Sequence, residues 1–377
     1  MISIETSKKA SPSTAVARLS FVEGLRGIAA FVVMVGHGIA FILAGAYYDD
    51  TDFSSASLLR RLIWPFLYGT QMVWLFIFIS GFSLYYSEIR RRSQQTSSTL
   101  TQYAWRRAWR ILPTYYAALL ISLLMIRFLP GMHVQPESSI FHLTPVTMGA
   151  VLSHVFLVHN LNLDWISQLN APLWSIATEA QLYLIFPLIL ACMHRFNPYV
   201  MGTVIIIAQQ LLQAIIPIPF FAQTFFFVSG MMMAHFVLHA PRMAPAPLLT
   251  AATALLGVAT WYGPKHYGLP GQTLFLLCFV ALILGLWNLK PSRWNLTTWT
   301  PILKLGACSY SLYVLHYPLL FLLFSFIKER GWSPDFQVLF MLIVGSTISV
   351  VAAWVFYLTI ERWSLERVRQ APVSMIR

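Results

Sequence analysis

The first long apolar stretch of the chain holds the two residues best suited to chemistry. Arg26 and His37 are separated by ten residues within the run from Leu19 to Ala46. In a helix this spacing is three turns plus about 20°, so both side chains share one face, about 16 Å apart along the axis. A histidine at mid-depth in a bilayer is costly unless it faces the bundle interior or a wet cavity. The pair therefore indicates the wall of a site, and the alternative for His37 is a hydrogen bond that joins two helices.

A second histidine lies inside another apolar run. His316 is part of GACSYSLYVLHYPLL, where Tyr310, Tyr313 and Tyr317 recur at three- and four-residue spacing. This spacing places their hydroxyl groups along one helix face, and Pro318 is able to kink the helix there. The alternative is that these serines and tyrosines only join packed helices.

An acid follows what resembles a helix start. Asn170 and Pro172 have the residue types of an N-terminal cap and first turn, and Glu179 comes next. Glu179 lies with Trp174 and Tyr183, and an aromatic side chain beside a carboxylate is suited to binding a sugar. The alternative is an acid in the aromatic belt at the membrane interface.

Basic and small residues mark two further positions. Arg106 and Arg110 are four residues apart on one helix face, ahead of Ile-Leu-Pro113. They are either topology determinants or a clamp for the phosphates of a nucleotide-like donor. Ser80 precedes Gly81 in the second apolar run, and such a pair permits close helix contact or adds a polar contact for a ligand.

The composition defines the class of protein that must position these residues. Of 377 residues, 58% are hydrophobic and only 10% are charged, against about 25% in soluble domains. The 25 Lys and Arg outnumber the 13 Asp and Glu, but they cluster beside apolar runs. This pattern follows the positive-inside rule of membrane proteins and does not indicate a nucleic-acid partner. No histidine, cysteine or acid cluster has metal-ligand spacing, so no metal is expected.

The apolar runs predict an all-α bundle of about ten membrane-spanning helices. Segments 199–217 and 220–239 are separated only by Pro217-Ile-Pro219 and predict a helical hairpin. Residues 146–160 are too mixed for a full span and predict a re-entrant or interfacial element. The ten segments are 26–46, 64–87, 111–129, 179–195, 199–217, 220–239, 247–262, 270–288, 305–327 and 336–360.

The basic loops set the expected orientation in the cell membrane. Residues 88–110 carry six arginines and one acid, while 128–194 contain neither Lys nor Arg. The positive-inside rule then places 88–110 and both termini in the cytoplasm and 130–170 outside. We expect a cytoplasmic tail at 1–18, one membrane domain at 19–363 and a second cytoplasmic tail at 364–377.

Six motifs in one order give the chain a resemblance to a known family. It resembles the acyltransferase 3 family of integral membrane O-acyltransferases, from Leu19 to about Trp363. The family has a motif of an arginine, ten residues and a histidine, which matches Arg26 and His37. The six motifs are EGLRGIAAFVVMVGH (23–37), FISGFSLYYS (78–87), RRAWRILPTYY (106–116), LWSIATEAQLYLIFP (173–187), GACSYSLYVLHYP (306–318) and IERW (360–363).

Two departures from the family pattern stand out. The family often has two adjacent acids where this chain has Glu179 and Ala180, and it often ends in Glu-Arg-Pro where Trp363 follows Arg362. The resemblance makes His37 the essential histidine and Arg26 its partner.

The resemblance implies transfer of an acyl group, expected to be acetyl, from acyl-CoA to a hydroxyl of an extracytoplasmic or cell-surface carbohydrate. His37 would act as general base or as a transient acyl carrier, because the pKa of imidazole, about 6.5, suits either role. Arg26, with Arg106, Arg110 and Ser80, would bind the donor.

Glu179, Trp174, Tyr313 and His316 would line the acceptor side. Acyl-CoA is a substrate here, and no permanently bound cofactor is expected. The rival function is a glycolipid transporter or flippase without acyl-transfer chemistry, which would not depend on acyl-CoA.

Overall fold

The computed structural model describes residues 12–49, 58–94, 96, 99–133, 143–262, 268–289 and 296–370. The principal helices are α1 (Pro12–Asp49), α2 (Leu58–Ile63), α3 (Gly69–Ser93), α4 (Leu100–Phe128), α5 (Met148–Val155), α6 (Leu173–Arg195), α7 (Pro198–Ile215), α8 (Pro219–His239), α9 (Pro245–Tyr262), α10 (Leu269–Asn288), α11 (Thr300–Ala307), α12 (Ser309–Lys328), α13 (Pro334–Phe340), α14 (Ser346–Phe356) and α15 (Arg362–Arg369). Short helical turns η1 (Trp64–Leu67), η2 (Pro130–His133), η3 (His159–Leu161), η4 (Leu296–Thr298), η5 (Met341–Gly345) and η6 (Tyr357–Glu361) complete the described elements.

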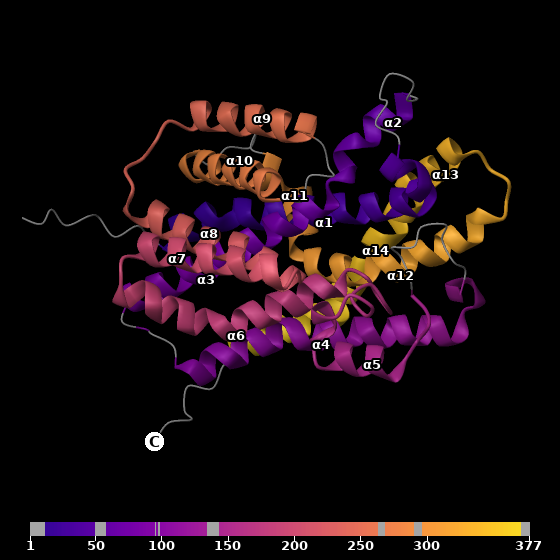
Figure 1. The fold of residues 1–377 in the computed structure, drawn as a ribbon, viewed down its shortest axis with the longest axis horizontal. Helices are drawn as coiled ribbons and strands as arrows, with labels where there is room; N and C mark the ends of the chain where they lie inside the picture. Colours follow the sequence, from indigo (N-terminus) through magenta and orange to yellow (C-terminus); the bar gives the residue numbers. More distant parts are fainter. Residues whose placement is uncertain are drawn as a thin grey trace, which may run out of the picture.

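The long helices run roughly along one axis and form a bundle (Figure 1). Within the described residues, nine helices are long and apolar enough to cross a membrane, and Pro245–Trp261 is a shorter apolar helix. The all-α prediction is therefore confirmed. The predicted hairpin is also present, because α7 and α8 pack together on either side of residues 216–218.

Helix α1 lies at the centre of the contacts that build the site. It packs against α3, α11 and α12. Its approach to α11 is close: a Cβ on Gly27 would lie 2.6 Å from the backbone nitrogen of Gly306. Only glycine permits this close approach of α1 to α11.

Helices α3 and α8 also pack through glycine. A Cβ on Gly81 would lie 2.0 Å from the Phe227 carbonyl oxygen, and one on Gly230 would lie 2.0 Å from the Phe78 carbonyl oxygen. The close-contact role considered for Gly81 is therefore correct. Gly81 contacts α8, whereas the preceding residue Ser80 points to Glu179 of α6.

The last long helix is interrupted by two π-helical turns. It runs from Pro334 to Val368, with turns at η5 and η6. The second turn ends at the buried Glu361. Such turns hold an extra residue in the helix and often occur at functional sites.

Residues 146–160 form a short packed element. Helix α5 has eight residues, and its backbone carbonyls accept hydrogen bonds from α4: Tyr115 Oη donates to His154 at 2.8 Å and Tyr116 Oη donates to Val155 at 2.7 Å. Met148 and Phe156 remain exposed, at 73% and 70%. A packed helix with an exposed apolar edge has the form expected of an interfacial element.

The predicted cap of α6 is wrong. The helix begins at Leu173, and its N-cap residue is Pro172 without a side-chain cap. Asn170 instead donates from Nδ2 to Ser122 Oγ at 3.1 Å and to the Val314 carbonyl at 2.8 Å. Its amide therefore ties the loop before α6 to α4 and α12, because a buried amide is most stable where several groups satisfy it.

Candidate active site

A cavity lies inside the bundle, where five long helices each supply a polar side chain. These are Arg26 of α1, Ser80 of α3, Arg110 of α4, Glu179 of α6 and Tyr313 of α12. The cavity thus gathers residues that are up to 287 positions apart in the sequence, 26 and 313. A ligand in this space would meet two guanidinium groups, a carboxylate and five hydroxyls, those of Ser80, Ser175, Ser309, Tyr310 and Tyr313.

The two arginines of the cavity are half-buried cations. Arg26 and Arg110 interact electrostatically with Glu179 and with each other. Within the described part of the chain, neither guanidinium forms an ion pair or a hydrogen bond. Since an enclosed cation is most stable beside an anion, this arrangement is suited to an anionic ligand.

Glu179 is held by neutral donors. Its Oε1 accepts hydrogen bonds from Ser80 Oγ and Tyr183 Oη, each at 2.5 Å. Tyr183 is itself fixed, because its carbonyl accepts from Tyr103 Oη at 2.8 Å and the Arg107 guanidinium lies 5.4 Å from the centre of its ring. The carboxylate therefore has a fixed position on the cavity wall.

His37 and His316 form a pair across helices α1 and α12. His37 Nδ1 lies 2.9 Å from His316 Nε2, and the two rings are stacked with centroids 5.1 Å apart. His316 is fully buried, and its Nδ1 lies 2.9 Å from the Leu312 carbonyl oxygen. The hydrogen bond between helices that was the alternative for His37 is therefore present, and its partner is a second titratable ring.

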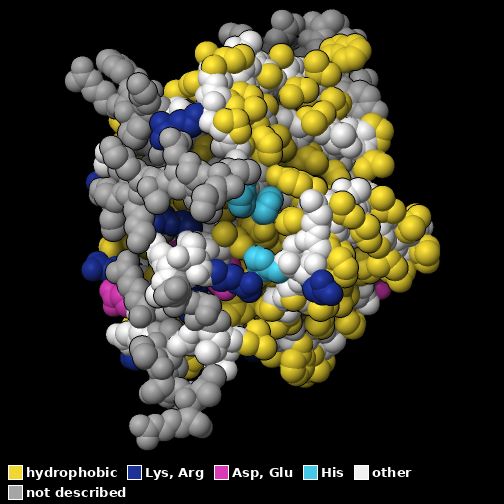
Figure 2. Space-filling model, turned by 90° about the vertical axis from the view of Figure 1, so that its left-hand side faces the viewer, with side chains coloured by type: hydrophobic (Ala, Val, Ile, Leu, Met, Phe, Trp, Pro, Cys, Tyr) yellow, Lys and Arg dark blue, Asp and Glu magenta, His cyan; other side chains and the backbone are white. Residues whose placement is uncertain are grey.

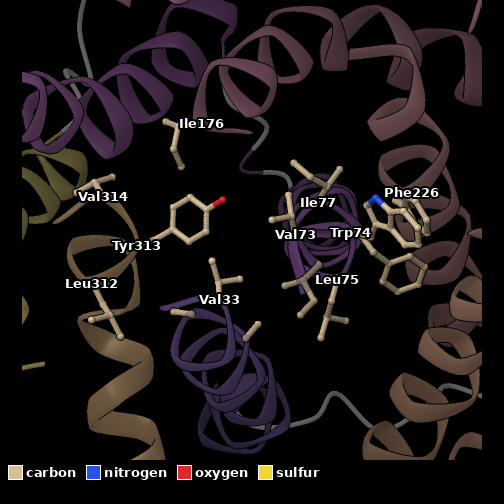
Figure 3. Close-up of a cluster of buried hydrophobic side chains, with 14 of the residues drawn as sticks. Val33, Val73, Trp74, Leu75, Ile77, Ile176, Phe226, Leu312, Tyr313 and Val314 are labelled. Atoms are coloured by element: carbon tan, nitrogen blue, oxygen red, sulfur yellow. The ribbon is translucent and has the colours of Figure 1, made fainter. Parts of the chain in front are cut away.

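Tyr313 links this histidine pair to the cavity. Its ring centre is 5.9 Å from that of His316, and its hydroxyl is 2.7 Å from Ser175 Oγ. Figure 3 shows the Tyr313 ring between Val33 of α1, Ile176 of α6 and Val73 and Ile77 of α3. The cavity and the histidine pair are thus adjacent parts of one region.

Five further arginines gather at one end of the bundle, here called the arginine-rich end. It is formed by the last turn of α3, with Arg90, Arg91 and Arg92, and the first turns of α4, with Arg106 and Arg107. Figure 2 shows basic and histidine side chains around a hollow with an apolar floor at this end. The surface is suited to anions that approach from that side.

Arg106 keeps unused hydrogen-bond donors at this end. Its Nε and Nη2 are buried and have no hydrogen-bond partner in the described residues. Arg110 lies one turn further along α4, about 6 Å along the axis, and lines the cavity. The structure therefore separates Arg106 from Arg110, although the sequence places both on one helix face.

The structure brings together most of the candidate residues. Arg26, Ser80, Arg110, Glu179 and Tyr313 line the cavity. Of the remaining four, His37 and His316 form the adjacent pair, whereas Arg106 and Trp174 are not among the cavity-lining residues. Trp174 lies in the first turn of α6, near η3, and is half-buried.

Glu361 is a buried acid that the site prediction did not include. Its Oε2 accepts hydrogen bonds from the backbone nitrogen and the hydroxyl of Ser311, in the first turn of α12. A carboxylate at a helix N-terminus is favoured by the helix dipole. The signal in the sequence was an acid at the end of an apolar run, within IERW.

A multi-pass membrane protein with a charged cavity inside its helix bundle is the class that this fold and site define. Residues 19–358 match the acyltransferase domain of the acyltransferase 3 family. The chain therefore belongs to this family.

A relative is known from Komagataeibacter xylinus. That protein, BcsY, is described as a membrane-bound transacylase and is 30% identical over 136 residues, 36% of this chain and 33% of its own length. The chain thus spans about a third of that relative. No solved structure matches the chain significantly.

Proposed function

We propose that the protein transfers an acyl group, expected to be acetyl, from acyl-CoA to a sugar hydroxyl of an extracytoplasmic or cell-surface carbohydrate. The observation that supports this most is the cavity that two arginines and a fixed carboxylate line together, beside a pair of histidines. Family membership supports the transfer of an acyl group, and the chemistry of the cavity supports an anionic donor.

The donor would approach from the arginine-rich end, which we assign to the cytoplasm on the positive-inside rule. Coenzyme A carries its phosphates at one end of an extended arm and its thioester at the other. Arg106 would bind phosphate at the mouth, and Arg26 and Arg110 would bind phosphate or orient the arm deeper in the bundle.

His37 would act as the general base. One of its ring nitrogens takes the proton of the sugar hydroxyl while that oxygen bonds to the thioester carbonyl carbon. The carbon–sulfur bond then breaks, and the leaving thiolate takes the proton back from His37. The products are an O-acyl sugar and free coenzyme A, and His37 returns to its neutral form.

The carbohydrate would enter from the opposite end, where Trp174 begins α6 near η3. Its hydroxyl would reach the region lined by Glu179 and Tyr313, next to His316. Donor and acceptor would therefore meet inside the bundle from opposite sides of the membrane.

Purified protein in detergent tests the proposal with acetyl-CoA as the probe. We expect acetyl-CoA to bind, and to be hydrolysed slowly when no carbohydrate is present. Mass spectrometry of cell-surface glycans from a host with and without the gene should then show acylated sugars only when the gene is present. A glycolipid transporter would neither bind acetyl-CoA nor change glycan mass, and that result would reject the proposal.

A further inference from the structure

The hydrogen bonds through His37 and His316 have a defined direction. A backbone carbonyl only accepts, so His316 Nδ1, 2.9 Å from the Leu312 oxygen, must carry a hydrogen. In a neutral imidazole the other nitrogen is then an acceptor, so His316 Nε2 accepts. The donor to it, at 2.9 Å, is His37 Nδ1. The proton-accepting lone pair of His37 is therefore on Nε2.

The neutral state of His316 follows from its surroundings. The ring is fully buried, and its two nitrogens contact a backbone carbonyl and another imidazole, neither of which is negatively charged. A positive charge in such a place is costly. The two aromatic side chains that contact the His316 ring, those of Tyr313 and His37, bring no negative charge to it either.

We propose that His316 is a positioning residue, which fixes the tautomer of His37 and so makes Nε2 the atom that accepts the acceptor's proton. This inference rests on the proposed role of His37 as base. The Leu312 carbonyl orients His316, and His316 orients His37, as the third group of a catalytic triad orients its base. When His37 Nε2 takes the proton, Nδ1–H still donates to His316, and the proton later leaves Nε2 for the thiolate.

This role differs from the one that the sequence suggested. The family resemblance implied that His316 lines the acceptor side, whereas the structure places its ring on His37. A purely space-filling role predicts that any apolar side chain of similar size would serve. A positioning role predicts that the replacement must accept a hydrogen bond at the place of Nε2.

The tautomer can be read without any enzyme activity. In the full-length protein with ¹⁵N-labelled histidine, protonated and unprotonated ring nitrogens resonate far apart, and His37→Gln identifies the signals of His37. We expect Nδ1 of His37 to be protonated and Nε2 unprotonated at neutral pH. In His316→Leu the share of His37 that carries its proton on Nε2 should rise. A wild-type His37 with its proton on Nε2 would overturn the inference.

Turnover of acetyl-CoA gives the second measurement. Gln places an amide oxygen near the position of His316 Nε2, so His316→Gln should keep kcat within about 10-fold of wild type. His316→Leu should lower kcat about 100-fold or more, because loss of the correct tautomer costs up to about 10⁴-fold in a comparable triad. The KM for acetyl-CoA should stay within about two-fold in both.

Phe321→Leu is the matched control, a buried substitution on the same helix that packs on Phe41. It should lower the melting temperature about as much as His316→Leu and leave kcat unchanged. An active wild-type enzyme whose His316→Leu variant keeps full kcat would reject the positioning role alone. A wild-type protein that does not turn over acetyl-CoA would reject the proposed function, while the tautomer measurement would still stand.

Discussion

Glu179→Gln removes one charge and keeps an oxygen in the same place. In the native protein two hydroxyls donate to Oε1 of Glu179, from Ser80 and Tyr183, each at 2.5 Å. A hydrogen bond to a charged acceptor contributes about 1.5–3 kcal/mol and a neutral one about 0.5–1.5. Each bond should therefore weaken by roughly 1 kcal/mol, and the substitution should cost about 2 kcal/mol from these two bonds.

The loss of the negative charge of Glu179 should lower the stability of the protein further, through the two arginines of the cavity. In Glu179→Gln, Arg26 and Arg110 still face the cavity, but they lose the favourable interaction with the negative charge of Glu179. Thermal unfolding in detergent should show a melting temperature lowered by several degrees. Added acetyl-CoA, as an anion, should restore part of the loss, because a ligand that binds the folded state stabilises it.

Ser80→Ala is the control, since it removes one of the two donors and keeps the charge. It should cost about 1.5–3 kcal/mol, the contribution of one hydrogen bond to a charged acceptor. The double variant should cost less than the sum of the two single variants, because they share one interaction. Strict additivity, or a Glu179→Gln variant with wild-type stability and turnover, would refute the reasoning.

The same variant tests the acceptor-side role expected from the sequence. On that expectation Glu179→Gln impairs transfer to a carbohydrate more than it impairs acetyl-CoA binding. Equal loss of both would indicate that Glu179 supports the fold of the cavity instead. The ratio of the two losses is measured by calorimetry for binding and by thiol release for transfer.

Three further predictions concern orientation, acidity and the donor. To test the orientation, single cysteines are placed in a cysteine-free background at Thr96 and Leu163, because Ser97 and Ser139 in the same two loops lie outside the described residues. In intact cells an impermeant thiol reagent should label only Leu163→Cys. Labelling of Thr96→Cys alone would invert the orientation. Burial lowers the pKa of His154 to about 4 and that of His159, which also lies beside His154, to about 2. Below about pH 6.5 the unfolded chain therefore binds protons that the folded loop does not. The stability of this loop should fall between pH 6.5 and 4 by up to about 1.4 kcal/mol per pH unit for each histidine. Equal protease resistance of the loop at pH 7.5 and 5 would contradict this. Arg26→Ala should weaken acetyl-CoA binding in calorimetry, and Arg26→Lys should recover part of it by restoring the charge; wild-type affinity in Arg26→Ala would remove Arg26 from the donor site.

The membrane fold could be predicted because it depends on local features of the sequence. Long apolar runs predict spans whatever their neighbours are. The hairpin at Pro217 and Pro219 was predictable for the same reason, since two prolines close together end one helix and begin the next. The helix-contact role of Gly81 was also open to sequence reasoning, because small residues permit close packing.

The sequence could suggest candidate site residues, but it could not show which of them lie together. Helix periodicity says which residues share a face, but it does not say which other helix that face meets. The contact between His37 and His316 joins positions 279 residues apart, and nothing local in either run indicates it. Asn170 was misread because an asparagine before an apolar run is typical of a cap, whereas here packing gave its amide two buried partners.

His37→Ala tests the central claim most directly. His37 lies about three turns from Arg26 on α1, so the proposed function assigns phosphate binding and proton transfer to different residues of one helix. The variant, once shown to insert and to unfold like the wild type, should bind acetyl-CoA with nearly unchanged affinity in calorimetry. Its rate of thiol release should fall by about 10²–10⁴-fold, the effect of a lost general base. A folded His37→Ala enzyme with wild-type turnover would contradict the account and leave His37 as a residue that only joins two helices.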